Sequence, residues 1–275
     1  MKAIKTTRTM KTTNTQKAPS GVGEWACHSY NWQQGCEHDC KFCYAKAMAV
    51  RFQRSTPESW AQPEPRPIQI QWRKKKGRIM LPTSHDITPF NIDDSVAVLH
   101  GILKVGNEVL IVSKPHLSCV ERLCAELEPY KGQILFRFTI GSINDEVLGY
   151  WEPNAPSFAE RLMSARHAYK QGFSTSISCE PMLDLNIGAV IKAVRQYVTD
   201  AIWLGRANNL RQSIALNCPG DTYAKRMADV LLAEQSDDYL RGLYQQYKDD
   251  PMIKYKDSIK KAAGLERPTE AGLDV

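Results

Sequence analysis

Short apolar segments alternate with amphipathic segments along most of this 275-residue chain. Strand-like runs occupy residues 25–30, 78–81, 108–112, 133–140, 173–179 and 201–204; helical patterns cover 93–103, 117–127, 157–170 and 187–197, and a weaker one follows the last strand. Repetition of this kind predicts parallel strands joined by right-handed crossovers. Six units are fewer than the eight of a closed barrel. We therefore expect an α/β fold with a partial (β/α)6 barrel.

The segments outside the repeat divide the chain into parts. Residues 1–20 are basic, rich in Thr and Ser and free of acidic residues, which predicts a flexible tail, either a solvated terminus or an arm for nucleic acid. The barrel spans residues 21–220, interrupted at 55–77 by an insertion that is rich in proline and ends in a basic run. Residues 221–275 have a charged helical pattern and are expected to form a helical C-terminal extension.

Composition limits the class of protein. Hydrophobic residues make up 43% of the chain, enough to bury a core. We found neither an apolar run of roughly 18 residues, as a membrane span requires, nor a signal peptide, so we expect a cytoplasmic protein. The net charge of +6 suits an anionic partner, although many soluble enzymes carry as much. With eight cysteines, three of them within eight residues, metal or redox chemistry is favoured over a disulfide framework.

Polar residues gather directly after the predicted strands. They are Thr83, Ser84, His85 and Asp86 after the second strand, Ser113 and Lys114 after the third, and Ser142, Glu180 and Arg206 after the following ones. In parallel α/β folds the loops at the carboxyl ends of the strands converge on one mouth. We therefore expect these side chains to face one site.

The cysteine cluster is the most specific motif. Cys36, Cys40 and Cys43 lie at positions i, i+4 and i+7 on a short loop that leads into a helical segment. Three thiolates at this spacing can bind three irons of a [4Fe-4S] cluster and leave the fourth iron open to chelate a small molecule. The competing interpretation is a structural zinc site, which needs a fourth ligand from His38, Cys27 or His28. Zinc sites usually consist of two separated pairs of ligands, so the triplet favours iron.

The motif Cys36-x-x-x-Cys40-x-Phe42-Cys43, followed by a strand-helix repeat, resembles the signature of the radical S-adenosylmethionine (SAM) superfamily. Residues 79–86 (IMLPTSHD), 111–114 (IVSK) and 152–157 (EPNAPS) resemble the spore photoproduct lyase-like branch of that superfamily. The resemblance spans about residues 25–204. It implies a [4Fe-4S] cluster and SAM as cofactors, reductive cleavage of SAM to a 5′-deoxyadenosyl radical, and an electron donor such as flavodoxin or ferredoxin.

The resemblance also assigns cofactor-binding residues. It places Phe42 and Tyr44 beside the bound cofactor, and it places Thr83, Ser84, Asp86, Lys114 and Ser142 around the methionyl group and ribose of SAM. A lysine suits this position because its ammonium can pair with the SAM carboxylate. Each residue also has a structural alternative: Lys114 can be a surface lysine, and Asp86 and Ser142 can stabilise turns. The pair Ser157 and Glu160 has the spacing of a capping box, so we interpret it as structural.

The substrate is where the sequence departs from the family pattern. In spore photoproduct lyases a cysteine near the end of the second strand returns a hydrogen atom, but residues 81–86 (LPTSHD) contain none. Cys179 could be a substitute hydrogen donor, or a small buried residue in a strand. The basic tail, residues 73–76, Trp60 and Trp72 could hold nucleic acid. A nucleic-acid base or nucleotide is our first expectation, followed by a peptide or small metabolite; a non-catalytic zinc-stabilised nucleic-acid-binding module and a radical SAM fold without activity are further alternatives.

Overall fold

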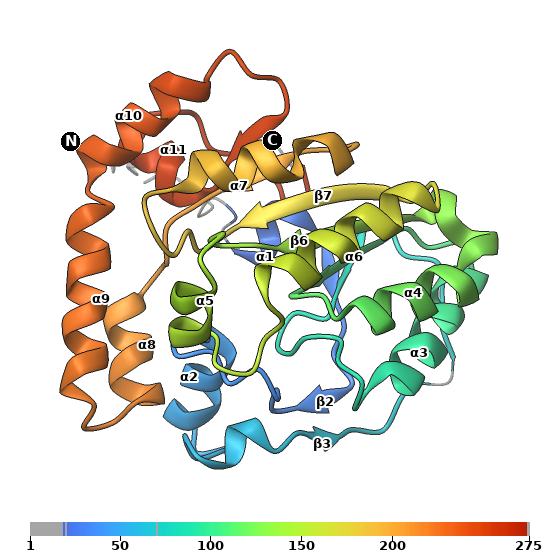
Figure 1. The fold of residues 1–275 in the computed structure, drawn as a ribbon. Coiled ribbons are helices and arrows are strands. Elements are labelled where there is room, and N and C mark those ends of the chain that lie inside the picture. The colour runs from blue at the N-terminus through green and yellow to red at the C-terminus, as the bar shows by residue number, and fades with distance from the viewer. Residues whose placement is uncertain (1–18, 20, 70, 274–275) are drawn as a thin grey trace, which may run out of the picture.

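The computed structural model describes residues 19, 21–69 and 71–273, and its centre is a parallel sheet (Figure 1). Seven strands lie in the order β1 (His28–Ser29), β4 (Ile79–Leu81), β5 (Val109–Ser113), β6 (Ile134–Thr139), β7 (Ser174–Cys179), β8 (Ile202–Leu204) and β9 (Ile253–Tyr255). All neighbouring pairs are parallel. Within the described residues β1 and β9 are the two edges, so the sheet is open. Apart from Pro19, the predicted basic tail lies outside the described residues.

The crossover helices cover the outer face of the sheet (Figure 1). They are α3 (Ile92–Lys104), α4 (Leu117–Glu126), α6 (Phe158–Lys170) and α7 (Ile187–Val194), with the 3₁₀ turns η2 (Glu128–Gln133) and η3 (Arg195–Tyr197). These four helices agree with the sequence prediction to within a few residues at each end. A short helix, α5 (Asp145–Trp151), was not predicted. The weaker pattern after the last strand is α8 (Leu210–Asn217).

Side chains alternate between the two faces of the sheet, as strand geometry requires. In β7, Ile177 and Cys179 belong to the large core between sheet and helices. On the inner face a smaller cluster includes Trp25, Met80 and Trp203. Beyond this cluster, toward the carboxyl ends of the strands, polar groups occupy the inner face.

Two boundaries differ from the sequence prediction. The first predicted strand, residues 25–30, is reduced to the two residues of β1, because residues Val22–Trp25 form the helix α1 and Trp25 turns into the inner cluster. The C-terminal extension contains α9 (Thr222–Glu234), α10 (Asp237–Tyr247) and α11 (Asp257–Ala263), but it also supplies the seventh strand, β9. Strand β9 has only three residues, so its alternation of apolar and polar side chains is too short to recognise between helical segments.

The insertion at 55–77 supports the cysteine loop. It contains the 3₁₀ turn η1 (Ser59–Ala61) and β3 (Glu64–Pro65), which pairs antiparallel with β2 (Gln33–Gln34) just before the first cysteine. Trp60 packs with Cys36 in a small buried cluster. Elsewhere, no helix among the described residues reaches the length and apolar character that crossing a bilayer would require.

Candidate active site

The cysteine loop is shaped by a glycine turn and by the insertion. Gly35 has a φ of +84°, and a Cβ atom there would lie 2.7 Å from the carbonyl oxygen of Trp60. The Cys36 amide donates to that same carbonyl at 2.9 Å. Cys36 and Cys40 are each 5% exposed, and Cys43 precedes α2 (Tyr44–Arg51) with its sulfur accepting the Lys46 amide. Only glycine allows this close approach, so the loop conformation depends on Gly35.

Helix α8 fixes the second half of the loop. The side-chain amide of Asn217 donates to the carbonyl oxygens of Lys41 (2.8 Å) and Cys43 (2.9 Å). The Lys41 amide in turn donates to the Trp151 carbonyl at the end of α5. The backbone around the three thiols is therefore held by hydrogen bonds from distant parts of the chain.

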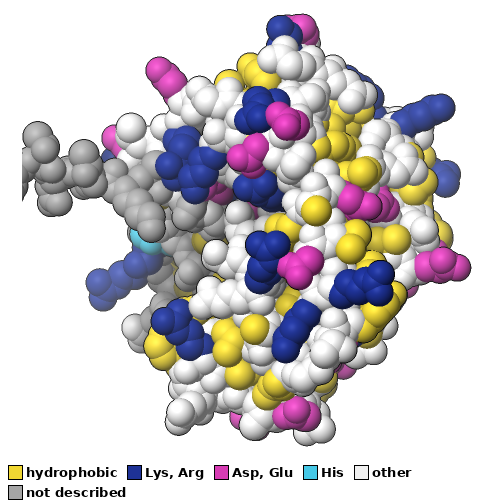
Figure 2. Space-filling view, turned by 90° about the vertical axis from the view of Figure 1, so that its left-hand side faces the viewer, with side chains coloured by type: hydrophobic (Ala, Val, Ile, Leu, Met, Phe, Trp, Pro, Cys, Tyr) yellow, Lys and Arg dark blue, Asp and Glu magenta, His cyan; other side chains and the backbone are white. Residues whose placement is uncertain are grey.

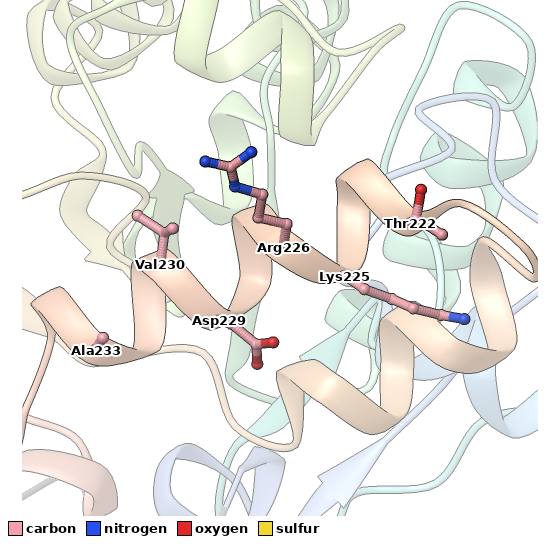
Figure 3. Close-up of a pocket in the computed structure, with 6 residues that line it drawn as sticks. All are labelled: Thr222, Lys225, Arg226, Asp229, Val230 and Ala233. Carbon is pink, nitrogen blue, oxygen red and sulfur yellow. The ribbon is translucent and has the colours of Figure 1, made fainter.

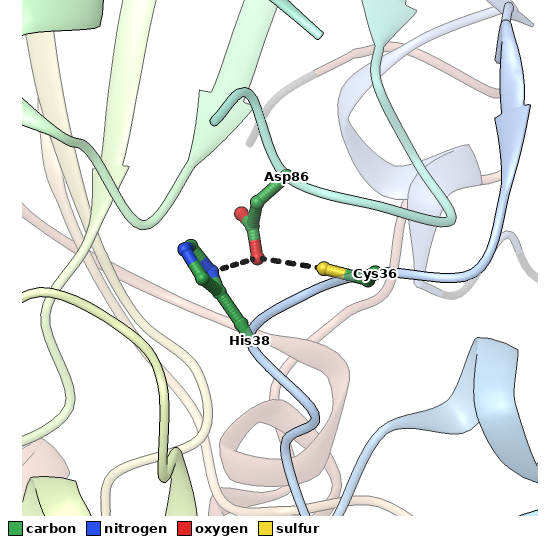
Figure 4. A group of neighbouring side chains, drawn as sticks. All are labelled: Cys36, His38 and Asp86. Atoms are coloured by element: carbon green, nitrogen blue, oxygen red, sulfur yellow. Dashed lines mark hydrogen bonds and ion pairs between the residues drawn. The ribbon is translucent and has the colours of Figure 1, made fainter. Parts of the chain in front are cut away.

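Asp86 lies at the centre of a buried polar cluster beside the cysteines (Figure 4). Its carboxylate accepts from the Ser113 hydroxyl (3.0 Å), the Lys114 amide (2.8 Å), the Lys114 ammonium (3.0 Å) and His38 Nδ1 (2.9 Å). Cys36, His38 and Asp86 each offer an atom within 4.8 Å of the others. The polar residues after β4 and β5 thus meet the cysteine loop, as the sequence predicts.

The charges of this cluster stabilise one another. Burial alone would raise the pKa of Asp86, but Lys114 and His38 hold that pKa well below its usual value. Burial alone would lower the pKa of Lys114, but Asp86 and the neighbouring thiols hold it well above its usual value. The pKa values of the three cysteine thiols are raised, mainly by burial. Without a cation, burial therefore keeps these thiols protonated, and a bound metal would have to displace their protons.

A pocket of about 730 Å³ opens next to the three cysteines. It is lined by most of the residues that the resemblance assigns to the cofactor, namely Cys36, Cys40, Phe42, Cys43, Tyr44, Thr83, Ser84, Asp86 and Lys114. Its volume lies in the range of about 300–1,000 Å³ that is typical of small-molecule sites. The structure therefore brings nine predicted residues to one cavity at the carboxyl ends of the strands.

The loop after β4 is held in place by a residue that sequence reasoning missed. Asn31 Oδ1 accepts from the amides of Thr83 (2.7 Å) and Ser84 (2.8 Å), and its Nδ2 donates to the Thr83 hydroxyl. The Tyr44 hydroxyl also donates to the Thr83 carbonyl. Asn31 directly follows the strand predicted at residues 25–30 and lies two residues after β1, so its position after a strand was the signal available in the sequence.

Two residues that were predicted to bind SAM or to donate hydrogen do not line the pocket. Ser142 is fully buried, donates to Asp184 and accepts from the Asn144 amide, which makes it a turn residue. Cys179 is also fully buried, and it packs in the core on the helix side of β7. Its neighbours Ser178 and Glu180 line the pocket instead. The geometry therefore contradicts the predicted roles of Ser142 in binding SAM and of Cys179 in donating hydrogen.

The wall opposite the cysteines comes from residues that the sequence analysis largely missed. Glu180 and Asn208 follow β7 and β8, while Trp25 belongs to α1. Lys256 and Asp257 follow β9, the strand that was not predicted. Arg206, predicted to face the mouth, pairs instead with Asp237 (2.9 Å) and does not line the pocket. Once β9 is recognised, the rule that polar residues follow strands also finds Lys256 and Asp257.

The aromatic residues proposed for base stacking are not available for it. Trp60 is 2% exposed and packs against the cysteine loop. Trp72 packs on Gly101 of α3 and against the Tyr30 ring, at 4.7 Å between ring centroids. The basic residues 73–76 are exposed. On the face shown in Figure 2, Lys and Arg side chains are interspersed with Asp and Glu.

The residues 157–160 have the structural role that we expected, with one difference. The Ser157 hydroxyl accepts the Glu160 amide and caps α6. The Glu160 carboxylate, however, accepts the Leu117 amide at the start of α4 and lies 3.7 Å from His116. This segment therefore joins two helices, whereas a complete capping box would use Glu160 within its own helix.

A second hollow lies on the surface of α9 (Figure 3). It is lined by Thr222, Lys225, Arg226, Asp229, Val230 and Ala233, which all come from that one helix. Asp229 is paired with Arg211 of α8 at 2.5 Å. One helix face encloses no ligand, so the pocket beside the cysteines is the better candidate site.

Two of the proposed zinc ligands are not placed with the cysteine loop. The Cys27 thiol donates to the Ala271 carbonyl, and His28 Nε2 lies 3.1 Å from the Lys76 carbonyl. Neither residue lines the pocket. Of the three candidates, only His38 lies beside the cysteines, where its two nitrogens contact Asp86 and His116.

Comparisons with known proteins agree with this geometry. No family model matches the chain. The uncharacterized protein ORF301 of the Acidianus two-tailed virus is 26% identical over 185 residues, and the match spans 60% of each chain. Spore photoproduct lyase with a dinucleoside spore photoproduct superimposes with a TM-score of 0.52 and 15% identity, covering 88% of this chain and 79% of that one. SuiB of Streptococcus suis bound to SAM gives a TM-score of 0.50 and 12% identity, covering 85% and 51%.

The chain shares the fold of spore photoproduct lyase and of SuiB. The likeness to spore photoproduct lyase covers most of both chains, in agreement with the branch that the sequence motifs resemble. Sequence identities this low establish the architecture alone, so the activity has to be argued from the site.

Proposed function

We propose that this protein is a radical SAM enzyme whose [4Fe-4S] cluster is held by Cys36, Cys40 and Cys43. The observation that carries the proposal is that the three cysteines and Lys114 line one pocket of about 730 Å³, with Lys114 close enough to Cys36 and Cys40 to interact with them electrostatically. Three thiolates with one open iron suit SAM chelation better than electron transfer alone. The zinc alternative is weakened by the positions of Cys27 and His28.

The donor set fits such a cluster. Cys36 and Cys40 are buried, Cys43 is half-buried, and the cationic Lys114 lies close enough to Cys36 and Cys40 to affect their titration. Burial of the first two cysteines limits the access of water to an iron–sulfur cluster bound there. When bound, the cluster supplies an electron that cleaves SAM and yields a 5′-deoxyadenosyl radical, which abstracts a hydrogen atom from the substrate.

The protein's own residues bind and orient. Lys114 can pair with the SAM carboxylate, and Asp86 holds the lysine side chain in place with its 3.0 Å ion pair. Thr83 and Ser84 present hydroxyls at the pocket on a loop fixed by Asn31. Phe42 and Tyr44 line the same end, where a flat ring can pack.

For the substrate we propose a nucleic-acid base or a nucleotide, to be modified or repaired. The net charge of +6 and the exposed basic residues 73–76 support an anionic substrate. The likeness to a spore photoproduct lyase that holds a dinucleoside ligand points the same way. The electron would come from a partner such as flavodoxin or ferredoxin.

The deciding experiment is 5′-deoxyadenosine formation by anaerobically reconstituted, reduced protein given SAM. Wild type should form 5′-deoxyadenosine and show thiolate-to-iron absorption near roughly 400 nm. Cys40→Ala should lose both, whereas Cys27→Ala, which alters a cysteine outside the pocket, should keep both. A colourless, zinc-loaded wild type would overturn the proposal.

A further inference from the structure

The pocket has two chemically different ends, which follow from the strand order. The cysteines and Lys114 lie by the ends of β4 and β5, while Glu180, Asn208 and Lys256 follow β7, β8 and β9 toward the other edge of the sheet. On the proposed function the first end is filled by the cluster and SAM. The second end then faces the part of the substrate that the protein must recognise.

The second end is a built site that joins four parts of the chain. The Lys256 ammonium contacts the Gly21 carbonyl (3.2 Å), Glu24 (3.0 Å) and Glu180 (3.3 Å), and it lies 3.7 Å from the centre of the Trp25 ring. A Cβ atom on Gly205 would lie 2.8 Å from Lys256 and 3.3 Å from Glu180. The glycine therefore leaves the space that this arrangement requires.

The charged groups at this end are paired with one another. Lys256 contacts Glu24 and Glu180, and Lys261 and Arg267 both pair with Asp257. Buried Lys260 also lies within electrostatic reach of Glu24 and Asp257. Carboxylates that already have cationic partners favour a neutral polar group over an ammonium group as a further partner.

Glu180 and Asn208 retain hydrogen-bonding capacity toward the pocket. One carboxylate oxygen of Glu180 is used by Lys256, and the other accepts the Asn208 side-chain amide at 3.2 Å. A carboxylate oxygen has two acceptor positions and an amide nitrogen has two hydrogens. Among the described residues, the contact between Asn208 and Glu180 uses one acceptor position of the oxygen and one hydrogen of the amide. A second acceptor position on Glu180 and a second N–H of Asn208 therefore lie side by side.

We infer that Glu180 and Asn208 form a substrate-recognition subsite for a neutral cis-amide edge, in which an N–H and a C=O group lie on the same side of a planar ring. The substrate N–H donates to Glu180, and its C=O accepts from Asn208. Lactam and imide rings have this edge, and so do several nucleobases. The inference rests on the proposed function, since it takes the pocket to be the substrate site.

The test uses reconstituted protein with its cluster and SAM, under anaerobic conditions. The probes are two pairs that differ by one methyl group on nitrogen: glutarimide with N-methylglutarimide, and 1-methyluracil with 1,3-dimethyluracil. Ligand-observed NMR titration measures their affinities. Wild type should bind each N–H compound about tenfold or more tightly than its N-methyl partner, since a hydrogen bond to a charged group is lost.

Two variants assign the effect to the subsite. Glu180→Gln leaves Lys256 with Glu24 and the Gly21 carbonyl, so we expect it to fold. Its neutral amide oxygen accepts a weaker hydrogen bond than the carboxylate does, so the preference for N–H compounds should fall severalfold. Asp184→Asn makes the same chemical change in the same loop but outside the pocket, and it should keep the preference. Both variants should bind SAM as wild type does.

The outcomes separate this inference from the proposed function. If wild type binds SAM but binds neither N–H probe, or binds methylated and unmethylated probes equally, the subsite is wrong and the radical SAM proposal stands. If wild type discriminates the probes but never forms 5′-deoxyadenosine, the subsite stands and the proposed function fails. A preference that is undiminished in Glu180→Gln also overturns the assignment.

Discussion

The Lys114 ammonium lies 3.0 Å from Asp86 Oδ2, and the two side chains are only 13% and 11% exposed. Asp86 follows β4 and Lys114 follows β5, so the pair ties two neighbouring strand ends together. His38 connects the same carboxylate to the cysteine loop. One carboxylate thus sets the relative position of the thiols and of the cation nearest to them.

Breaking this pair should be costly, because it leaves a buried charge without its partner. We expect Lys114→Met and Asp86→Asn each to lower the free energy of unfolding by about 3–5 kcal/mol. The double variant should lose clearly less than the sum of the two. Urea unfolding of all four proteins under anaerobic conditions gives the coupling energy, and strict additivity would show that the pair contributes nothing as a unit.

The turn before the first cysteine should be intolerant of any side chain. Gly35→Ala places a Cβ atom against the Trp60 carbonyl at a positive φ, so we expect a loss of about 1–3 kcal/mol in stability and reduced iron after reconstitution. Gly149→Ala in α5 is the matched control, since no atom lies within 4 Å of its added Cβ. It should keep its iron and gain up to about 1 kcal/mol. Equal iron content in both variants would contradict this view of the loop.

The repeat and the metal motif could be predicted because their signals are local. Strands β4 and β5 are short runs that are almost wholly apolar, each followed by an amphipathic helix, and the three cysteines lie within eight residues. The strand-end rule then placed Asp86 and Lys114 beside them correctly. These inferences need only chain connectivity and the direction of parallel strands.

The far wall of the pocket could not be predicted in this way. Lys256 reaches it from β9, which follows two helices and is only three residues long. Its contacts with Glu24 join residues more than two hundred positions apart. The errors at Cys179 and Ser142 have a similar cause. Moving a residue by one position along a strand or turn places its side chain on the other face, and strand boundaries predicted from sequence are not accurate to one residue.

The position of Cys179 can be tested by thiol reactivity. The thiolate is the reactive form, and burial raises the pKa of Cys179 besides blocking access. We expect iodoacetamide to label exposed Cys27 readily and to leave Cys179 unlabelled until the protein is unfolded. Mass spectrometry of tryptic peptides measures both sites. Cys179→Ala should still form 5′-deoxyadenosine, and rapid labelling of Cys179 in the folded protein would refute its placement in the core.

His85 should make the protein sensitive to mild acid. Burial lowers the pKa of His85 from 6.5 to about 4, and Nδ1 lies 3.1 Å from the Asp86 carbonyl. Between these two pKa values the unfolded chain binds a proton that the folded protein does not. The contribution of neutral His85 to the free energy of unfolding is therefore complete above about pH 6.5 and is lost as the pH falls toward 4.

The variant His85→Asn removes this titration while keeping a side-chain amide that can donate to the same carbonyl. From pH 7.5 to pH 4.5, wild type should lose about 2–3 kcal/mol more stability than the variant does. Urea unfolding of both proteins at several pH values measures the difference. Parallel curves would mean that His85 titrates normally, and the imidazole would then have to be open to water.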